Sequence, residues 1–364
     1  MGIMQDDAIC AAAEHFDVGG AFAGAMPWGN GHIHDSYRVE FTAGGVQTRY
    51  LMQRMNTSVF PRVPELMENV ERVTAHMEQC AGEDPEVERR VLRLVPSRDG
   101  RTWHRDAEGA CWRMFPMIEG SRSVDRVESP EQCFRVAQAF GEFQRQLISL
   151  GGPRLHDTIA DFHHTPKRFA ALERAIAADG AGRAATAKAE IAFALERKAM
   201  TRLLLDAGLP ERVTHNDTKV NNVLLDERTD VALCVIDLDT VMPGLALYDF
   251  GDLVRTAASP AAEDERDLEK VFVRMDYYGE LVRGYLSSAG AFLTTREREL
   301  LAFSGKLITL EIGIRFLADH LNGDTYFKVH RVAHNLDRCR AQFRLVASME
   351  ELEHPMNRVV AQLA

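Results

Sequence analysis

The sequence predicts an α+β protein with two lobes, a small antiparallel-sheet lobe with one main helix and a larger, mostly helical lobe after it. Three observations lead to this fold class. Residues 1–115 contain short extended runs between turns and one helical pattern, and patterns of helical period dominate afterwards. A chain of 364 residues with 46% apolar side chains also suits two lobes with a substantial core. We place the first lobe at residues 1–118 and the second at residues 119–364.

The first lobe is predicted to contain a β-hairpin and one long helix. Residues 37–41 alternate apolar and polar side chains, and Thr42-Ala43-Gly44-Gly45 turns the chain into a second extended run that ends at Met55. From Pro64 to Met77, leucine, valine and methionine recur at the spacing of one helical face. Three further extended pieces are predicted near residues 91–95, 102–105 and 110–115.

The second lobe is predicted to be helical. The connector from Phe115 to Gly120 leaves the last strand, and a helix then starts at Ser129-Pro130-Glu131 and stops at Gly151-Gly152, because serine caps a first turn that contains proline. Short strands are predicted at residues 223–225 and 231–236. Further helices are predicted near residues 166–179, 183–207, 264–288, 295–321 and 328–350.

Composition argues against several classes of function. The 43 basic and 54 acidic residues give a formal net charge of −11, which disfavours nucleic acid and anionic membrane as partners. Six cysteines occur singly without a C-x-x-C pair, a usage typical of buried thiols in a reducing compartment. The N-terminus lacks a secretory pattern, and no apolar run of about 18 residues occurs, so we expect a soluble cytoplasmic protein with no membrane partner.

The densest polar cluster within apolar sequence runs from Val213 to Leu225. In it, Asn222 follows Asp217 by five positions, the spacing of the aspartate and asparagine in the kinase loop H-R-D-x-x-x-x-N. This spacing puts a carboxylate that accepts a hydroxyl proton and an amide oxygen that binds magnesium on one short loop. A return strand then delivers Asp237-Leu238-Asp239, so we predict Asp217 as the catalytic base and Asn222, Asp237 and Asp239 as Mg²⁺ ligands.

Taken alone, the His-Asn-Asp-Thr run would read as a turn rich in capping residues. The run together with the strand end resembles the aminoglycoside phosphotransferase and choline kinase-like superfamily, whose signature is H-x-D-x-x-x-x-N followed by I-D-x-D/E. The matching residues are His215, Asp217, Asn222, Ile236, Asp237 and Asp239. The resemblance implies a two-lobed protein-kinase-like fold that binds ATP between its lobes. It also implies that Asp249 and Asp252 are structural, with a buried aspartate bracing the catalytic loop. We do not expect Asp249-Phe250-Gly251 to be the kinase metal motif, because it lies 32 residues after Asp217, whereas Asp237 ends the strand predicted to pair within the catalytic hairpin.

Nucleotide contacts are predicted at the start of the first lobe. Gly29, Gly31 and His32 lie in a loop before the first hairpin strand, where a kinase places its glycine-rich loop, although His34 occupies the third glycine position. Two glycines alone would also fit an ordinary turn, which is the alternative to a nucleotide-binding loop. Position favours the nucleotide loop, because the segment leads directly into a hairpin.

Further nucleotide contacts are predicted on the second hairpin strand and in the connector. This strand lacks the lysine that kinases place there, so Arg54 is the candidate cation, with Glu68 or Glu71 as its ion-pair partner. A solvent-facing arginine is the alternative. Met117 and Ile118 in the connector are also predicted to contact the nucleotide.

A finer resemblance covers nearly the whole chain. Residues 31–33, 53–56, 215–222, 237–244 and 311–317, followed by 322–327, are similar to N-acetylhexosamine 1-kinases. This resemblance implies Mg²⁺- and ATP-dependent phosphorylation of the anomeric hydroxyl of N-acetylglucosamine (GlcNAc) or N-acetylgalactosamine (GalNAc). It also implies Asp217, Arg315 and Tyr326 as substrate-binding residues. On spacing alone, Arg315 would pair with Glu311 at i,i+4.

Two alternatives remain open at the level of the sequence. One is a kinase of the same fold with another acceptor, such as an aminoglycoside, an amino alcohol or another sugar, because fold does not determine substrate. The other is a non-catalytic nucleotide-binding protein, which the missing lysine and glycine would allow.

Overall fold

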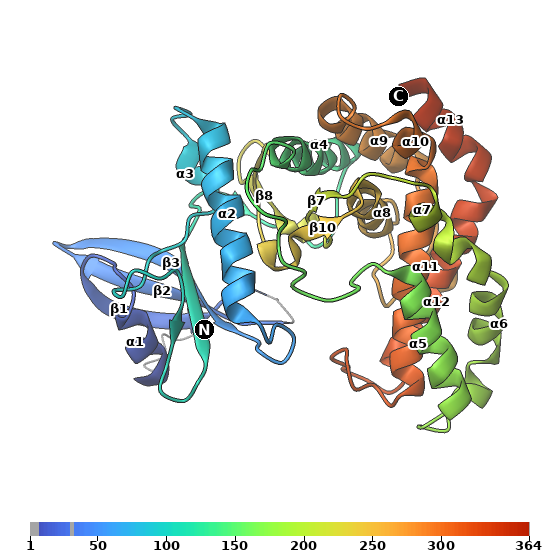
Figure 1. Ribbon diagram of the computed structural model, residues 1–364, viewed down its shortest axis with the longest axis horizontal. Helices are drawn as coiled ribbons and strands as arrows, with labels where there is room; N and C mark the ends of the chain where they lie inside the picture. Colours follow the sequence, from blue (N-terminus) through green and yellow to red (C-terminus); the bar gives the residue numbers. More distant parts are fainter. Residues whose placement is uncertain (1–6, 30–32, 364) are drawn as a thin grey trace. The chain divides into compact units, whose positions relative to one another are not determined.

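A computed structural model describes residues 7–29 and 33–363 of the protein. They form two compact units, each assembled from separate stretches of chain (Figure 1). An antiparallel sheet lies in unit 1 and most helices lie in unit 2, which confirms the predicted fold class. Unit 1 takes the described residues of 1–121, 149–159 and 233–241, and unit 2 takes those of 122–148, 160–232 and 242–364.

Unit 1 contains a five-stranded antiparallel sheet of order β1-β2-β3-β5-β4. Gly44 and Gly45 form the β2–β3 turn with φ values of 57° and 83°, as a two-residue type I′ loop requires, and this confirms the predicted hairpin. Strand β1 and helix α1 were not predicted, because alanine is the commonest residue in both segments and leaves no clear apolar pattern to detect. The bounds are α1 Asp7–Glu14, β1 Ala21–Pro27, β2 Asp35–Ala43, β3 Val46–Met55, β4 His104–Arg105 and β5 Cys111–Pro116.

Helix α2 (Val63–Ala81) is the predicted helix, and it buries leucine, methionine and valine on one face. The prediction of a strand near residues 91–95 is wrong. That segment follows the short helix α3 (Val87–Arg90) as irregular chain, and the Val95 amide donates to the Met114 carbonyl at 2.9 Å. The valines at its ends are buried without forming a ladder.

Two later stretches of chain belong to unit 1 and contact α2. Asn69 on α2 is fully buried, and its Nδ2 donates to the carbonyls of His156 (2.8 Å) and Val241 (3.1 Å). The His156 amide donates in return to Asn69 Oδ1 at 2.9 Å. One buried asparagine thus fixes both stretches, including the residues that follow the Asp-x-Asp motif.

Unit 2 contains the predicted helix α4 (Pro130–Leu147), whose cap Ser129 accepts a hydrogen bond from the Gln132 amide. Strands β7 (Arg212–Thr214) and β10 (Met242–Gly244) pair antiparallel. The remaining helices are α5 Thr165–Ala178, α6 Lys188–Glu196, α7 Leu203–Asp206, α8 Ala246–Ala257, α9 Met275–Ala289, α10 Thr295–Glu299, α11 Leu301–Leu321, α12 His334–Glu351 and α13 Glu353–Leu363. The remaining strands of the chain are β6 Ser121–Arg122, β8 Val223–Asp226 and β9 Ala232–Val235.

Four predicted helices are shorter or broken. The helix predicted at residues 328–350 begins only at His334, as α12. Residues 183–207 split into α6, α7 and two 3₁₀ turns, because an alanine-rich stretch favours helix without offering one strong apolar face. Residues 264–274 are irregular apart from one 3₁₀ turn, where Asp267 accepts from the Glu269 amide and so competes with helix. The helix predicted at 295–321 breaks at Leu300 into α10 and α11.

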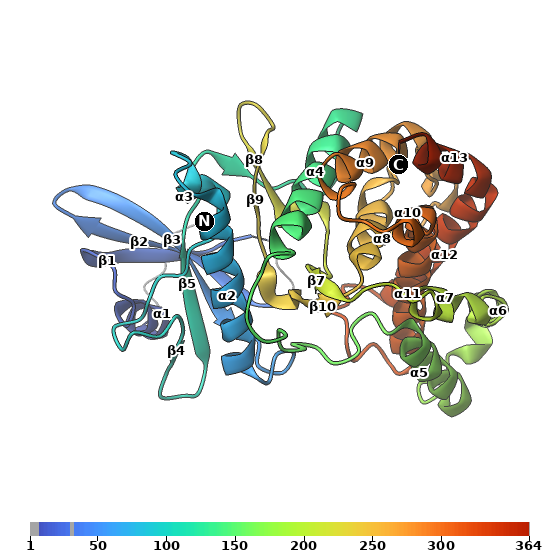
Figure 2. The same ribbon diagram turned by 45° about the horizontal axis from the view of Figure 1, so that its top comes forward.

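Helix α11 lies at the centre of unit 2, against α5, α8 and α12 (Figures 1 and 2). Gly251 on α8 allows the close approach, because a Cβ there would lie 2.5 Å from the Ser304 carbonyl oxygen on α11. This contact anchors the helix that carries Asp249. Within the described part of the chain, every helix is too short or too polar to cross a membrane.

Candidate active site

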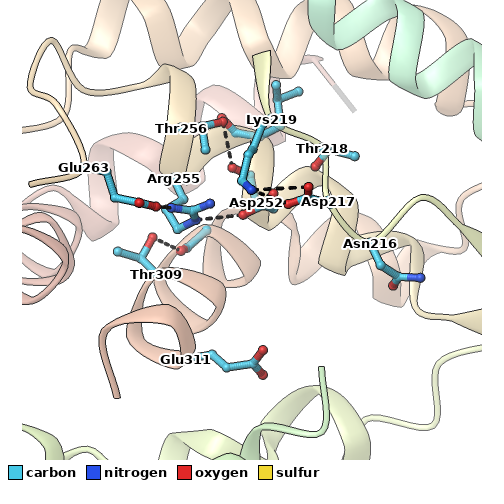
Figure 3. Close-up of polar contacts among 12 residues, drawn as sticks. Asn216, Asp217, Thr218, Lys219, Asp252, Arg255, Thr256, Glu263, Thr309 and Glu311 are labelled. Atoms are coloured by element: carbon cyan, nitrogen blue, oxygen red, sulfur yellow. Dashed lines mark hydrogen bonds and ion pairs between the residues drawn. The ribbon is translucent and has the colours of Figure 1, made fainter. Parts of the chain in front are cut away.

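The segment from Thr214 to Asn222 lies in unit 2 and brings Asp217 and Asn222 together (Figure 3 labels Asp217). Asn222 Nδ2 donates to the Asp217 carbonyl at 2.8 Å and to its Oδ2 at 3.3 Å. Lys219 Nζ lies 3.0 Å from Asp217 Oδ1. The Asp217 side chain keeps 21% exposure, so its carboxylate is organised by the loop yet accessible from solvent.

The charge on Asp217 is stabilised by its neighbours. Burial alone would raise the pKa of Asp217, but the Lys219 ammonium and the nearby His215 lower that pKa below its usual range. The Asp217 carboxylate in turn raises the pKa of Lys219. At neutral pH the loop therefore presents an anionic oxygen beside a cation.

Asp249 braces this loop, as predicted. Its carboxylate is 1% exposed and accepts hydrogen bonds from the amides of His215 (2.9 Å) and Asn216 (2.7 Å) and from Gln144 Nε2 (2.6 Å). The Thr218 hydroxyl donates to the Asp249 carbonyl at 2.5 Å. Although burial raises the pKa of Asp249, these donors hold its carboxylate in one orientation.

A group of charges lies beside the loop (Figure 3), in which Asp252 and Arg255 are buried and Glu263 is exposed. Arg255 Nε donates to Asp252 Oδ1 at 2.7 Å, and its Nη1 donates to Glu263 Oε1 at 2.8 Å. Both acidic groups also act on Lys219, where they add to the effect of Asp217 in raising its pKa. The predicted structural role of Asp252 agrees with this pairing.

The Asp-x-Asp motif belongs to unit 1 and holds two carboxylates in different settings. Asp237 is exposed and has left-handed backbone with φ of 60°. Asp239 is 2% exposed, and its oxygens pair with both terminal nitrogens of Arg113, one at 2.8 Å, and with His34 Nε2. Burial would raise the pKa of Asp239, but Arg113 and His34 hold it well below its usual range. These contacts favour a structural role for Asp239 over the predicted metal contact.

Sequence reasoning missed Arg113 and the role of His34. Arg113 Nε also donates to Gln53 Oε1 at 2.9 Å, and the two residues are cross-strand partners on β5 and β3. His34 Nδ1 accepts from the Asn56 amide at 2.9 Å, so its ring proton lies on the Nε2 that faces Asp239. The detectable signal is an arginine inside the apolar strand Cys-Trp-Arg-Met-Phe, since such a charge needs a buried partner.

The predicted nucleotide contacts fall in several settings. Gly31 and His32 lie outside the described residues, whereas Gly29 has left-handed backbone with φ of 76°. The Met117 amide donates to a carbonyl of β3 at 3.1 Å, and the Ile118 carbonyl accepts from a serine hydroxyl at 2.5 Å. Their assignment to the nucleotide stays a prediction.

Arg54 is exposed, and its guanidinium carbon lies 6.0 Å from the Trp112 ring centroid. The predicted pairing with Glu68 or Glu71 is wrong. Glu68 lies 3.0 Å from His156 Nε2, and Glu71 accepts from a threonine hydroxyl. The buried cation of the sheet is therefore the arginine of the neighbouring strand β5.

Arg315 on α11 lies in unit 2 among three aromatic rings. Its guanidinium carbon is 5.3 Å from the ring centroid of Phe162, 6.0 Å from that of Tyr326 and 5.7 Å from that of Phe327. Tyr326 is 60% exposed, so one side of this aromatic group is open to a ligand. The structure thus brings the two residues of the predicted sugar contact together.

The alternative ion pair between Arg315 and Glu311 is not formed. Among residues 7–29 and 33–363, the Glu311 carboxylate bonds to His163 and Thr165 instead. Arg168, like Arg315, is half-buried. Its Nε donates at 3.1 Å to the carbonyl of the residue before His163. Burial and the neighbouring Arg315 both lower the pKa of Arg168.

The chain is similar to known phosphotransferases in sequence and in fold. A family model described as the phosphotransferase enzyme family matches residues 25–291. A microcompartment-associated aminopropanol kinase is 18% identical with a TM-score of 0.59 over 97% of this chain and 99% of its own. An aminoglycoside phosphotransferase from Alicyclobacillus acidocaldarius (13%, TM-score 0.59) and a choline kinase from Cryptosporidium parvum (12%, TM-score 0.56) each align over 98% of both chains. At these identities the solved structures show a shared fold.

Proposed function

The chain belongs to the phosphotransferase enzyme family, and from this premise we propose that it transfers the γ-phosphoryl group of ATP to the anomeric hydroxyl of GlcNAc or GalNAc. Membership makes the chain a phosphotransferase that takes an alcohol group as acceptor and ATP as co-substrate. The observation that carries the finer proposal is Arg315, whose guanidinium lies among three aromatic rings in the unit that also holds Asp217.

Asp217 is the proposed base. Its carboxylate would accept a hydrogen bond from the sugar hydroxyl and take that proton as the oxygen bonds to the γ-phosphorus and the bond to ADP breaks. Lys219 keeps the carboxylate ionised, and Asn222 holds it through the amide nitrogen. The transfer needs little covalent help from the protein, so orientation of the hydroxyl is the main contribution of this loop.

The donor atoms suit Mg²⁺. Since Asn222 donates through its amide nitrogen, its Oδ1 is the atom proposed to bind the cation. The exposed carboxylate of Asp237 is also proposed as a metal ligand. Bound Mg²⁺ would neutralise charge on the phosphates. We propose that the ion pair between Asp239 and Arg113 holds the Asp-x-Asp motif in place. The predicted contact of Asp239 with the metal is the less important of its two proposed roles. Gly29, Gly31, His32, Arg54, Met117 and Ile118 remain proposed nucleotide contacts.

The charge around Arg315 supports an uncharged acceptor over an amino alcohol or an aminoglycoside. Arg315 and Arg168 lie close enough for one to lower the pKa of the other, and a cationic acceptor would be repelled by both. Glu311, a carboxylate that acts on both arginines, is already paired with His163. A guanidinium can donate to two sugar or acetamide oxygens, while an open aromatic ring can cover the apolar face of a sugar.

An ADP-release assay with Mg²⁺ and ATP tests this proposal. GlcNAc, GalNAc, glucosamine, choline, ethanolamine and an aminoglycoside should be compared at equal concentrations. We expect release with one or both N-acetylhexosamines, and a product whose phosphate is assigned to the anomeric carbon by phosphorus NMR. Preference for choline, ethanolamine or the aminoglycoside would contradict the proposed acceptor and leave the family assignment intact.

A further inference from the structure

His163 in unit 2 lies between two hydrogen-bond acceptors. Its Nδ1 is 2.7 Å from Glu311 Oε1 on α11, and its Nε2 is 2.9 Å from the carbonyl oxygen of Asn216. The side chains of His163 and Glu311 are 3% and 0% exposed. Thr165 donates to the second Glu311 oxygen at 2.6 Å, so both carboxylate oxygens are engaged.

These partners determine the protonation of the ring. A carbonyl oxygen and a carboxylate only accept, so both ring nitrogens must donate, and the ring is an imidazolium beside an anion. Burial alone would lower the pKa of His163, but Glu311 raises it above its ordinary value. Burial would likewise raise the pKa of Glu311, yet His163 and Arg315 lower it.

The Asn216 carbonyl belongs to the peptide that leads directly into Asp217. Asn216 has left-handed backbone with φ of 65°, a conformation that a non-glycine residue keeps only where its surroundings require it. The Asp249 carboxylate accepts a hydrogen bond from the Asn216 amide and so holds the peptide between His215 and Asn216. His163 donates to the Asn216 carbonyl and so holds the next one.

We propose that His163, supported by Glu311, is a positioning residue that orients the peptide before Asp217 and thereby aims its carboxylate at the acceptor hydroxyl. This inference rests on the proposed role of Asp217. Glu311 lies one helical turn before Arg315 on α11, so the same pair links the helix that carries the proposed sugar contact to the catalytic loop (Figure 3 shows Glu311 and the loop).

Two substitutions separate the two hydrogen bonds. The amide nitrogen of a glutamine reaches the position of Nε2, so His163→Gln keeps the bond to Asn216 and loses the one to Glu311. The shorter asparagine places its amide near Nδ1, so His163→Asn keeps a donor for Glu311 and loses the bond to Asn216. Both variants lose the imidazolium charge, and both should melt at a lower temperature than the wild type.

We expect His163→Asn to lower kcat by about 10- to 100-fold, because a small misplacement of a reacting group has an effect of that size. The KM values for ATP and sugar should change by less than about threefold, since binding groups are untouched. His163→Gln should keep most of kcat. Hydrogen exchange of residues 214–222, measured by mass spectrometry, should rise in His163→Asn and stay near wild type in His163→Gln.

A purely structural role gives a different pattern. The inference is overturned if kcat falls equally in both variants, if it follows melting temperature, or if loop exchange is alike in both. Failure of the proposed function is recognised separately, as a wild-type protein that phosphorylates no N-acetylhexosamine or as full turnover in Asp217→Asn. The exchange comparison then decides the positioning role by itself.

Discussion

Arg113 binds Asp239 through both carboxylate oxygens, and each of the two side chains is only 3% exposed. Arg113 lies on β5 of the sheet, whereas Asp239 follows β9 by a few residues in sequence. The pair therefore ties the Asp-x-Asp segment to the sheet of unit 1. Because Asp237 is two residues away, this link also limits where the proposed metal ligand can lie.

Removal of Arg113 should destabilise the protein strongly. Arg113→Met leaves the Asp239 carboxylate buried with His34 as its remaining side-chain partner, and breaking a buried pair in this way costs about 3–5 kcal/mol. Urea unfolding measures the change. The double variant Arg113→Met with Asp239→Asn removes the stranded charge and should recover part of the loss. A loss under about 1 kcal/mol in the single variant would contradict a buried, functional pair.

The same pair predicts how stability depends on pH. The folded pKa of Asp239 lies below its ordinary value of 3.8, so the unfolded chain binds the proton more readily. The stabilisation is therefore complete above the unfolded pKa and is lost as pH falls through the folded one. Unfolding of wild type and Asp239→Asn should differ by a constant free energy from about pH 8 to pH 5, and the difference should shrink below about pH 4. A difference that shrinks with rising pH would have the wrong sign.

Loss of the proposed base should lower turnover strongly without loss of nucleotide binding. Asp217→Asn keeps the size of the side chain and can still contact Lys219 and Asn222, but it removes the proton acceptor. We expect kcat to fall by about 10²- to 10⁴-fold, the usual contribution of general base catalysis. Calorimetric titration with ATP should show affinity close to wild type. Near-normal turnover would exclude Asp217 as the base.

Asp237 and Asp249 should give opposite phenotypes. Asp237 is exposed, so Asp237→Ala should stay folded and lose Mg²⁺-dependent nucleotide binding. Asp249→Ala removes the carboxylate that accepts from the amides of His215 and Asn216, at roughly 1–3 kcal/mol for each buried hydrogen bond lost, whereas Gln144 Nε2 keeps the Ala246 carbonyl at 3.3 Å. Its melting temperature should fall sharply. Exchanged phenotypes would place the metal at the literal Asp-Phe-Gly sequence instead.

The sequence predicts the parts of the site that are local in the chain. Asp217 and Asn222 are five residues apart, and their contact follows from the loop itself. Arg113 and Asp239 are 126 residues apart, and His163 and Glu311 are 148 apart, so no spacing pattern connects either pair. Helix α4 was found because a cap and an apolar face agreed, whereas residues 183–207 offered propensity without a cap or a continuous face.

The proposed sugar contact gives the last prediction. Arg315→Ala should raise the KM for the N-acetylhexosamine by about 10- to 100-fold, equivalent to roughly 1.5–3 kcal/mol for a hydrogen bond to a charged group, and leave the KM for ATP nearly unchanged. Arg296→Ala is the matched control, because that arginine is exposed and pairs within its own helix. Arg315→Lys keeps the charge but not the two-pronged geometry, so it should restore only part of the affinity. A variant that loses ATP affinity at an unchanged sugar KM would show that Arg315 contacts the nucleotide. The three aromatic rings around Arg315 would then bind the adenine ring of ATP and not the sugar.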